Sequence, residues 1–183
     1  MKLNESVFND FPVLITKRLT LRAIDLEDAR QIFEMRSNGR VNQFIPRPEM
    51  EKAEEAVELV ERTRNAWKNK QAIGWAGLLR GKSEIIGTCG LTSIDPDNLR
   101  AELGGEMHVS YWGKHIAFEA VSAIVHFGFH ELGLHSIEAK VSPDNRGAIY
   151  LLELLGFKKE AHFHDRILRN GRFSDMSVYT AIR

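Results

Sequence analysis

The stretch that decides the fold is AELGGEMHVSYWGKHIAFEAVSAIVHFGFHEL, residues Ala101–Leu132. Its first part, as far as Val109, is predicted to be a strand, and from Ile116 onward the apolar residues keep the three-to-four-residue spacing of a helix. Gly133 follows directly, and glycine is common just past a helix end. A short turn containing Gly113 therefore joins a strand to the most apolar helix of the chain.

Upstream of this stretch, the pattern predicts further strands and helices. Ile73–Leu79 and Glu84–Ile94 are apolar runs separated by a glycine turn, and they form a three-strand meander with the strand just described. Leu19–Ala23 alternates like a half-buried strand and leads, through the potential cap Asp25, into a short helix. Glu49–Lys70 has an apolar stripe opposite a charged face, which is typical of an amphipathic helix.

Downstream, the alternation of strand and helix continues. Ser136–Val141 reads as a strand, Arg146–Leu155 as a helix, and Phe157–Arg183 as a hairpin that turns at Asn170-Gly171. The order predicts an α/β (α+β) fold with a mixed, largely antiparallel central sheet flanked by about four helices.

Composition excludes several classes of protein. The chain has 183 residues, close to the length of one domain, so residues 1–183 are expected to form a single unit. Its 25 Lys and Arg balance 25 Asp and Glu, which argues against nucleic-acid or membrane-surface binding. The longest apolar or glycine run, Ala72–Leu79, is far short of the roughly 18 residues that span a bilayer. Cys89 is the only cysteine, so no internal disulfide forms, and a cytoplasmic location is expected.

The turn between strand and helix is a candidate anion site. A glycine-bearing turn at a helix start presents unpaired N–H groups beside the positive helix end, which suits a phosphate or pyrophosphate. Neither the P-loop nor the Rossmann glycine spacing occurs. A second motif, NRGA followed by LLELLGF, begins at Asn145, where the asparagine is either a helix cap or a ligand.

Together these segments resemble the GNAT superfamily of acetyl-CoA-dependent N-acetyltransferases. The resemblance runs from about Ile15 through Tyr179 and is carried by ITKRLTLR at 15–22, AELG at 101–104, the turn, and the segment from Asn145 to Phe157. The nearest branch is the ribosomal-protein-serine/alanine N-acetyltransferases, which share the Trp-Gly-Lys turn and the later Asn170-Gly171-Arg172 with Asp175.

The resemblance implies a cofactor site. The family's pyrophosphate turn falls on Trp112, Gly113, Lys114, His115, Ile116 and Ala117. Two positions depart from the family pattern: Trp112 replaces a polar residue and His115 replaces glycine. The backbone of Met107 and His108 is expected to pair with the pantetheine arm of acetyl-CoA like an added strand. Asn145 matches the asparagine that hydrogen-bonds the cofactor.

For catalysis, Glu102 matches the family's acidic position and is the candidate general base, acting directly or through water. An ordinary exposed strand glutamate is the alternative, and Glu106 is a second choice. The pair Gly104-Gly105 is expected to supply a bulge beside Glu102. The family's general-acid positions hold Leu152 and Ala148, so the leaving thiolate departs unassisted or takes a proton from water.

The expected reaction moves an acetyl group from acetyl-CoA to a primary amine, most simply a protein N-terminal amine, in a monomer or homodimer. A small-molecule amine (polyamine, amino sugar or antibiotic) and an inert acyl-CoA-binding module are the alternatives. The segment from Asn42 to Glu61 is expected to form the acceptor wall.

No metal is expected. His126 and His130 are four residues apart on a helix, a spacing that allows both to bind one zinc ion. Leu134, however, occupies the position of a zincin's third histidine. His162 and His164 share a strand face without a carboxylate at a matching position.

Overall fold

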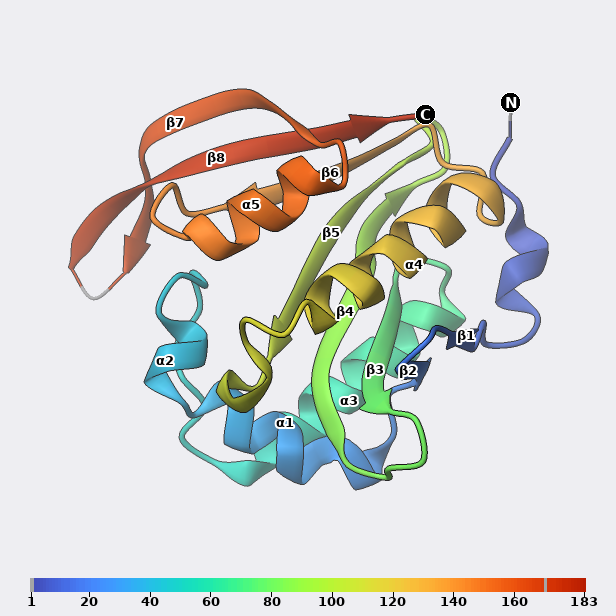
Figure 1. Cartoon of the computed structure of the whole chain (residues 1–183), viewed down its shortest axis with the longest axis horizontal. Helices are drawn as coiled ribbons and strands as arrows, with labels where there is room; N and C mark the ends of the chain where they lie inside the picture. The colour runs from blue at the N-terminus through green and yellow to red at the C-terminus, as the bar shows by residue number, and fades with distance from the viewer. Residues whose placement is uncertain (1, 170) are drawn as a thin grey trace.

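The computed structural model describes residues 2–169 and 171–183 and contains an eight-stranded sheet (Figure 1). The spatial strand order is β1-β2-β3-β4-β5-β6-β8-β7. The strands are β1 (Leu14–Ile15), β2 (Leu19–Ala23), β3 (Ile73–Leu79), β4 (Ile85–Asp95), β5 (Arg100–Met107), β6 (Ser136–Val141), β7 (Lys158–Arg169) and β8 (Arg172–Ile182). The α-helices are α1 (Ala29–Arg36), α2 (Gly39–Asn42), α3 (Ala53–Lys68), α4 (Ile116–His130) and α5 (Arg146–Leu154). Short 3₁₀ helices span Glu5–Phe8, Leu26–Asp28 and Val109–Tyr111.

The predicted fold class is confirmed. Neighbouring strands are antiparallel except for β5 and β6. Strands β3 and β6 have the predicted bounds, and Asp25 caps the helical segment by accepting a hydrogen bond from the Leu26 N–H. The prediction missed β1 and α2, because two to four residues are too few to show a period. Asn170, half of the predicted hairpin turn, lies outside the described residues.

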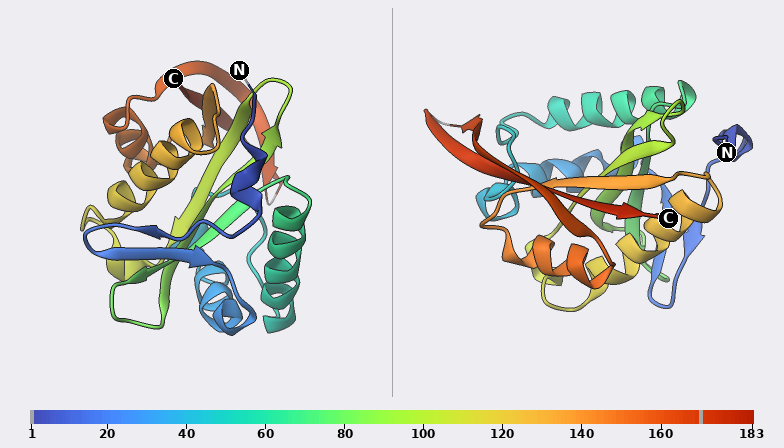
Figure 2. Two further views of the ribbon diagram at one scale, coloured as in Figure 1. Left: turned by 90° about the vertical axis from the view of Figure 1, so that its right-hand side faces the viewer. Right: turned by 90° about the horizontal axis from the view of Figure 1, so that it is seen from above.

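Helices cover both faces of the sheet, with α4 and α5 on one face and α1 and α3 on the other (Figure 2). On the α4 side, Trp75 is fully buried, packs edge-on against Phe127 and donates its indole N–H to the Pro12 carbonyl at 2.7 Å. The opposite core contains Ile32 of α1 and Val60 of α3. In the part of the chain that the structure describes, no helix is both long and apolar enough to cross a membrane.

The parallel strands β5 and β6 pair over only three residues, Arg100–Glu102 against Ser136–Glu138. Beyond that point β5 continues along β4 to Met107, whereas β6 continues along β8 to Val141. The two strands therefore separate, as Figure 1 shows. We call the opening between residues 103–107 of β5 and 139–141 of β6 the wedge.

Candidate active site

The turn into α4 presents a row of free backbone donors. Gly113 has φ +72° and His115 has φ +55°, and these left-handed residues lead the chain into the helix. Within the described residues, the N–H groups of 113–118 donate to no other protein group, and the first bond of the helix runs from the Glu119 N–H to the His115 carbonyl. Such donors at a helix start attract anions. The turn thus offers what a pyrophosphate requires.

An arginine from β1–β2 holds this turn from behind. Arg18 donates from Nη1 to the Lys114 carbonyl and from Nη2 to the His115 carbonyl, each at 3.0 Å. Its Nε donates to Glu119 Oε2 at 2.6 Å, and Thr16 Oγ1 donates to Glu119 Oε1 at 2.5 Å. Because the clamp occupies these two carbonyls of the turn, it fixes the peptide groups while the N–H groups stay free. We call this set the Arg18 clamp.

The clamp keeps Glu119 ionised. Burial by itself would raise the pKa of the Glu119 carboxyl, but the hydrogen bonds from Thr16 and Arg18 outweigh it and hold the pKa below its ordinary value. The charged form of Glu119 is thus stabilised in the folded protein. Only the folded chain brings these residues together, since Arg18 and Glu119 are 101 positions apart.

Strand β5 offers alternate backbone groups to the wedge. His108 donates its N–H to the Ile86 carbonyl at 2.9 Å, so even-numbered residues of β5 bond toward β4 in the antiparallel ladder. Leu103, Gly105 and Met107 consequently direct their N–H and C=O groups toward the wedge. An extended ligand arm lying there would find the donors of an unpaired strand edge.

The backbone groups of His108 already have partners within the chain. Its N–H is used by β4, its carbonyl accepts from the Tyr111 N–H at 3.0 Å, and its Nδ1 accepts from the Ser110 N–H at 3.3 Å. The neighbouring Met107 carbonyl accepts a hydrogen bond from Trp112 Nε1 at 2.8 Å. On the wedge side of β5, the N–H groups of Leu103, Gly105 and Met107 therefore stay without a partner within the described residues.

The adjacent glycines of β5 differ sharply. A Cβ on Gly105 would lie 2.8 Å from the Thr88 carbonyl oxygen and 2.9 Å from Cys89 Sγ, so the close packing of β4 requires glycine there. A Cβ on Gly104 would meet nothing within 4 Å. The bulge predicted here is wrong, because pairing with β4 runs unbroken from Glu102 to Met107 and the irregularity lies between Thr92 and Asp95. The divergence of β6, rather than a bulge, opens the strand.

Glu102 lies where the wedge begins, as the last β5 residue paired with β6. Its carboxylate accepts a hydrogen bond from Lys140 Nζ at 2.5 Å, and Glu138 Oε1 lies 3.4 Å from the same ammonium. The Glu102 side chain keeps 27% of its surface exposed. The hydrogen bond from Lys140 to Glu102 raises the pKa of the lysine ammonium, so the cation persists beside the carboxylate. Lys140 could not be predicted from the sequence, because it lies 38 positions from Glu102 and no motif contains both residues.

Glu106 occupies a different environment. Its side chain is only 1% exposed, forms an ion pair with Arg47, accepts from Arg36 Nε at 2.7 Å and accepts from Thr88 Oγ1 at 3.2 Å. Burial lowers the pKa of Arg47, and the attraction to Glu106 opposes that shift. The Glu106 carboxylate oxygens face the guanidinium groups of two partly buried arginines. Glu106 therefore anchors α1 and the following loop to β5 rather than serving as a base.

A groove of about 770 Å³ lies beside the wedge. Residues from three places line it: the loop after α2, the end of β6, and the β7–β8 hairpin; they include Phe44, Lys140, Asp144, Arg169 and Asp175. Of the segment expected to form the acceptor wall, residues 43–46 line this groove, whereas α3 packs on the sheet. We call this feature the acceptor groove.

One arginine joins the two sides of the acceptor groove. Arg169 of β7 donates from Nη1 to the Asn42 carbonyl at 2.7 Å and to the Ile45 carbonyl at 3.2 Å. Asn42 is fully buried, donates to the Arg36 and Asn38 carbonyls and accepts from Arg47 Nε at 2.9 Å. The loop after α2 is thus anchored on its inner side by Asn42 and on its outer side by Arg169.

The α5 positions match the sequence expectations in part. Asn145 caps α5, with its Oδ1 accepting from the Ala148 N–H at 3.1 Å, so its cap role is present and its amide N–H groups stay available. Leu152 is buried in the core, and Tyr150 is 59% exposed. Cys89 is also in the core region, where burial raises the pKa of its thiol to about 12.

The structure also corrects one premise about the histidines. His126 and His130 stack with ring centroids 4.3 Å apart. For His162 and His164, however, the carboxylate that the sequence analysis found lacking is present: Asp175 of β8 contacts both.

An unpaired strand edge, an amide-lined helix start and an adjoining groove define a class of transferase that holds an acyl-CoA beside an amine. The model of the Acetyltransferase (GNAT) domain family matches residues 18–158. The chain belongs to this GNAT family and is an acetyl-CoA-dependent N-acetyltransferase.

Among its relatives, the uncharacterized N-acetyltransferase p20 of Bacillus licheniformis is 34% identical over 170 residues, which is 93% of this chain and 96% of p20. RimL, a ribosomal L7/L12 α-N-protein acetyltransferase solved with coenzyme A, has a TM-score of 0.86 at 18% identity, with 93% of this chain and 98% of RimL covered. Spermidine N-acetyltransferase of Vibrio cholerae, solved with CoA and spermine, has a TM-score of 0.81 at 24% identity, with coverages of 91% and 96%. The last two likenesses show the shared fold.

Proposed function

We propose that this enzyme acetylates the N-terminal amine of a protein, acting in the cytoplasm as a single domain of residues 1–183. In this proposal the pantetheine arm of acetyl-CoA lies in the wedge along Leu103, Gly105 and Met107. The pyrophosphate lies on the N–H groups of 113–117, which the Arg18 clamp supports. The acceptor amine enters from the acceptor groove.

The chemistry follows from this placement. The acceptor ammonium gives a proton to Glu102, and the neutral amine attacks the thioester carbonyl carbon. The C–N bond forms and the C–S bond breaks, and the second proton lost by the attacking nitrogen passes through water to the CoA thiolate, which leaves as the free thiol. Glu102 then releases its own proton to solvent. N–H groups on the open edge of β5 are the donors available to the developing oxyanion. Lys140 Nζ donates a hydrogen bond to the Glu102 carboxylate at 2.5 Å and so holds it in position.

The charge of the acceptor groove is the observation that carries the choice of acceptor. Its lining holds three cations, Lys140, Arg169 and Arg172, against two carboxylates, Asp144 and Asp175. Asp175 already accepts hydrogen bonds from neighbouring groups. Among the described residues, Asp144 is the lining carboxylate whose side chain has no partner in the protein. One free carboxylate suits one ammonium group, as a protein N-terminus carries, whereas a polyamine brings several.

RimL, a ribosomal L7/L12 α-N-protein acetyltransferase, supports the same choice by its likeness of fold. The second candidate, a small-molecule amine, is favoured by the likeness to the spermidine enzyme. The mixed charge of the acceptor groove argues against a polycationic acceptor such as spermidine. It does not argue against an amino sugar, which carries a single ammonium group.

A thiol-release assay with acetyl-CoA tests the proposal. Peptides that begin with serine or alanine should be acetylated with kcat/KM at least about tenfold above spermidine and glucosamine, because only they fill an extended groove. Mass spectrometry should place the acetyl group on the α-amine. A preference for spermidine or an amino sugar would contradict the proposed acceptor, and no release with any amine would revive the inert-module alternative.

A further inference from the structure

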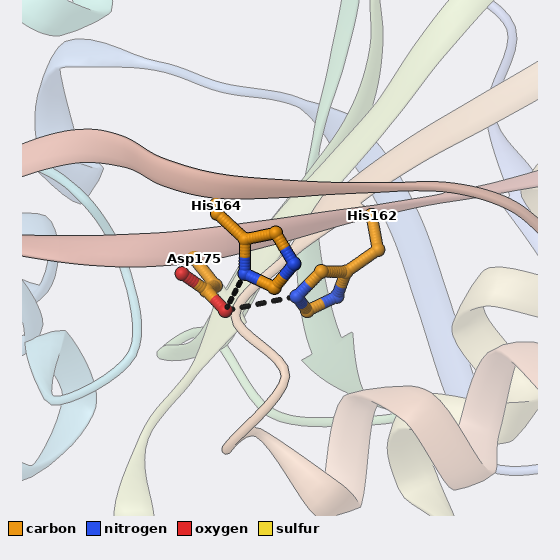
Figure 3. A group of neighbouring side chains, drawn as sticks. All are labelled: His162, His164 and Asp175. Atoms are coloured by element: carbon orange, nitrogen blue, oxygen red, sulfur yellow. Dashed lines mark hydrogen bonds and ion pairs between the residues drawn. The ribbon is translucent and has the colours of Figure 1, made fainter.

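Three side chains of the β7–β8 hairpin converge beside the acceptor groove, which Asp175 also lines (Figure 3). His162 Nε2 lies 2.8 Å and His164 Nδ1 lies 3.1 Å from the same oxygen, Asp175 Oδ2. One potential ligand atom from each residue lies within 4.8 Å of the other two. Two imidazole nitrogens and a carboxylate oxygen thus surround one small volume.

The backbone explains why the three meet. The β7–β8 pairing shifts register between Phe163 and Ile167, and Asp165 within that irregularity has φ +50°. The Asp165 N–H donates to Asp175 Oδ1 at 3.0 Å. One carboxylate oxygen is therefore held by the irregular backbone, and the other is directed at the two rings, whose centroids are 4.6 Å apart. The cluster is preorganised by the strand rather than by chance surface contact.

We propose that His162, His164 and Asp175 bind a divalent transition-metal ion, with Zn²⁺ the best match. Zinc sites combine imidazole nitrogen and carboxylate oxygen, and three protein ligands leave one position for water. The ion would lie between the two ring nitrogens and Asp175 Oδ2, displacing any ring proton directed at that oxygen. No step of acetyl transfer passes through this ion.

Two groups near His162 have opposite effects on its ability to bind a metal: Ser177 favours binding and Lys159 opposes it. Ser177 Oγ, on a residue only 1% exposed, lies 3.1 Å from His162 Nδ1 and can accept its N–H when Nε2 binds a metal. Lys159 Nζ lies 3.4 Å from the same Nδ1. An ammonium group only donates, so Lys159 favours the tautomer that keeps a proton on Nε2 and competes with the metal.

Metal binding would tie β7 to β8 where their pairing is interrupted. The same hairpin carries Arg169, which holds the loop on the other side of the acceptor groove, and Asp175 lines that groove. The ion is thus expected to stiffen one wall of the acceptor groove.

Titration calorimetry of the full chain with Zn²⁺ tests the site. We expect one bound Zn²⁺ per chain and a rise of the melting temperature with Zn²⁺. His164→Ala is the decisive variant because that side chain is 81% exposed and its loss leaves the fold intact. Its Zn²⁺ affinity should fall by more than about 100-fold, since loss of outer-shell partners alone costs about 10–100-fold. Lys159→Ala should tighten binding, and Ser177→Ala should weaken it by about tenfold.

The His126→Ala/His130→Ala double variant is the matched control, because it removes the other close histidine pair and should leave the affinity unchanged. Absence of Zn²⁺ binding in the wild-type chain would overturn the proposal. An unchanged affinity in His164→Ala, or a loss confined to the double variant, would do the same. Neither readout depends on acetyl transfer, so the proposal stands or falls independently of the proposed function.

Discussion

The two walls of the site are built by opposite means. In the proposed site, the cofactor wall consists of backbone donors, namely the N–H groups of 113–118 and the open edge of β5, and the Arg18 clamp holds the turn through its Lys114 and His115 carbonyls. The acceptor wall consists of side chains of both signs, and Arg169 holds it by bonding to loop carbonyls. Backbone donors recognise a constant group such as pyrophosphate whatever the side chains are. Side chains recognise a variable group, so specificity is expected to reside in the acceptor wall.

Glu102 lies at the junction of both walls, and its replacement should have the largest effect. Glu102→Gln keeps the shape and removes the base, so kcat/KM should fall by about 100-fold or more with acetyl-CoA affinity nearly unchanged. Glu138→Gln is the matched control, because Glu138 is 3.4 Å from the same Lys140 ammonium and should lose little activity. Wild-type kcat/KM in Glu102→Gln, or an equal loss in Glu138→Gln, would remove Glu102 from the role of base.

A break confined to the cofactor wall should follow from Gly113→Pro. Proline holds φ at about −65°, whereas Gly113 has φ +72°. The turn must therefore rearrange, and its backbone N–H groups no longer point to one place. Calorimetry should show CoA affinity reduced by more than about tenfold. Gly81→Pro is the control, because Gly81 also has positive φ and open surroundings but lies in the β3–β4 turn. If the two variants bind CoA alike, the pyrophosphate lies elsewhere.

A break confined to the acceptor wall should follow from Arg169→Ala. Loss of its bonds to the Asn42 and Ile45 carbonyls frees the loop, and KM for the peptide should rise by about tenfold, within the range for bonds to charged groups. CoA affinity should stay unchanged. Arg18→Ala should show the reverse pattern, with weaker CoA binding and an unchanged peptide KM. If each variant weakened CoA binding and raised the peptide KM to the same extent, the two walls would not act separately.

The two glycines of β5 sharpen the contrast between packing and binding. Gly105→Ala should destabilise the fold by about 1–3 kcal/mol, because the added methyl overlaps Thr88 and Cys89. Gly104→Ala should leave the melting temperature unchanged, since its Cβ meets nothing within 4 Å. It should still lower kcat/KM if ligand fills that space. A fully active Gly104→Ala would show that neither substrate approaches this position.

The smallest effect concerns the pH dependence of the Arg18 clamp. The folded-state pKa of Glu119 is depressed, so its contribution to stability is present above the unfolded pKa of about 4.3 and is lost as pH falls through the folded value. The melting temperature of wild type should therefore drop more steeply than that of Glu119→Gln below about pH 5. Parallel curves would show that the carboxylate adds nothing to the clamp.

The sequence predicted the parts of the site that local pattern determines. The turn at 112–117 follows from a strand, a glycine and an apolar helix in succession, whereas the bounds of β3 follow from its apolar run and those of β6 from its alternation. The separation of β5 from β6 could not be predicted, because the register of a parallel pair depends on β8, which lies far along the chain.

Side-chain partnerships between distant residues were equally out of reach. Arg18 meets Glu119, Lys140 meets Glu102, and His162 meets Asp175 only because the sheet order brings their strands and helices together. For the last pair, the register shift in β7 decides which Asp175 oxygen faces the histidine rings. The spacing of apolar residues in the sequence does not predict such a shift. The bond from the His108 N–H to β4 was out of reach for a related reason, since which edge of β5 each residue faces is set by the ladder with β4.

Hydrogen exchange with a bisubstrate, a peptide N-terminus joined to CoA through an acetyl bridge, tests the account of two walls most directly. CoA alone should protect amides of residues 103–107 and 113–118, and the bisubstrate should add protection of the loop at 43–46 and of the hairpin at 171–176. Another groove lies between residues 13–18 and α4. Protection of amides there, with no change in the exchange of residues 103–107 in the wedge, would contradict the account.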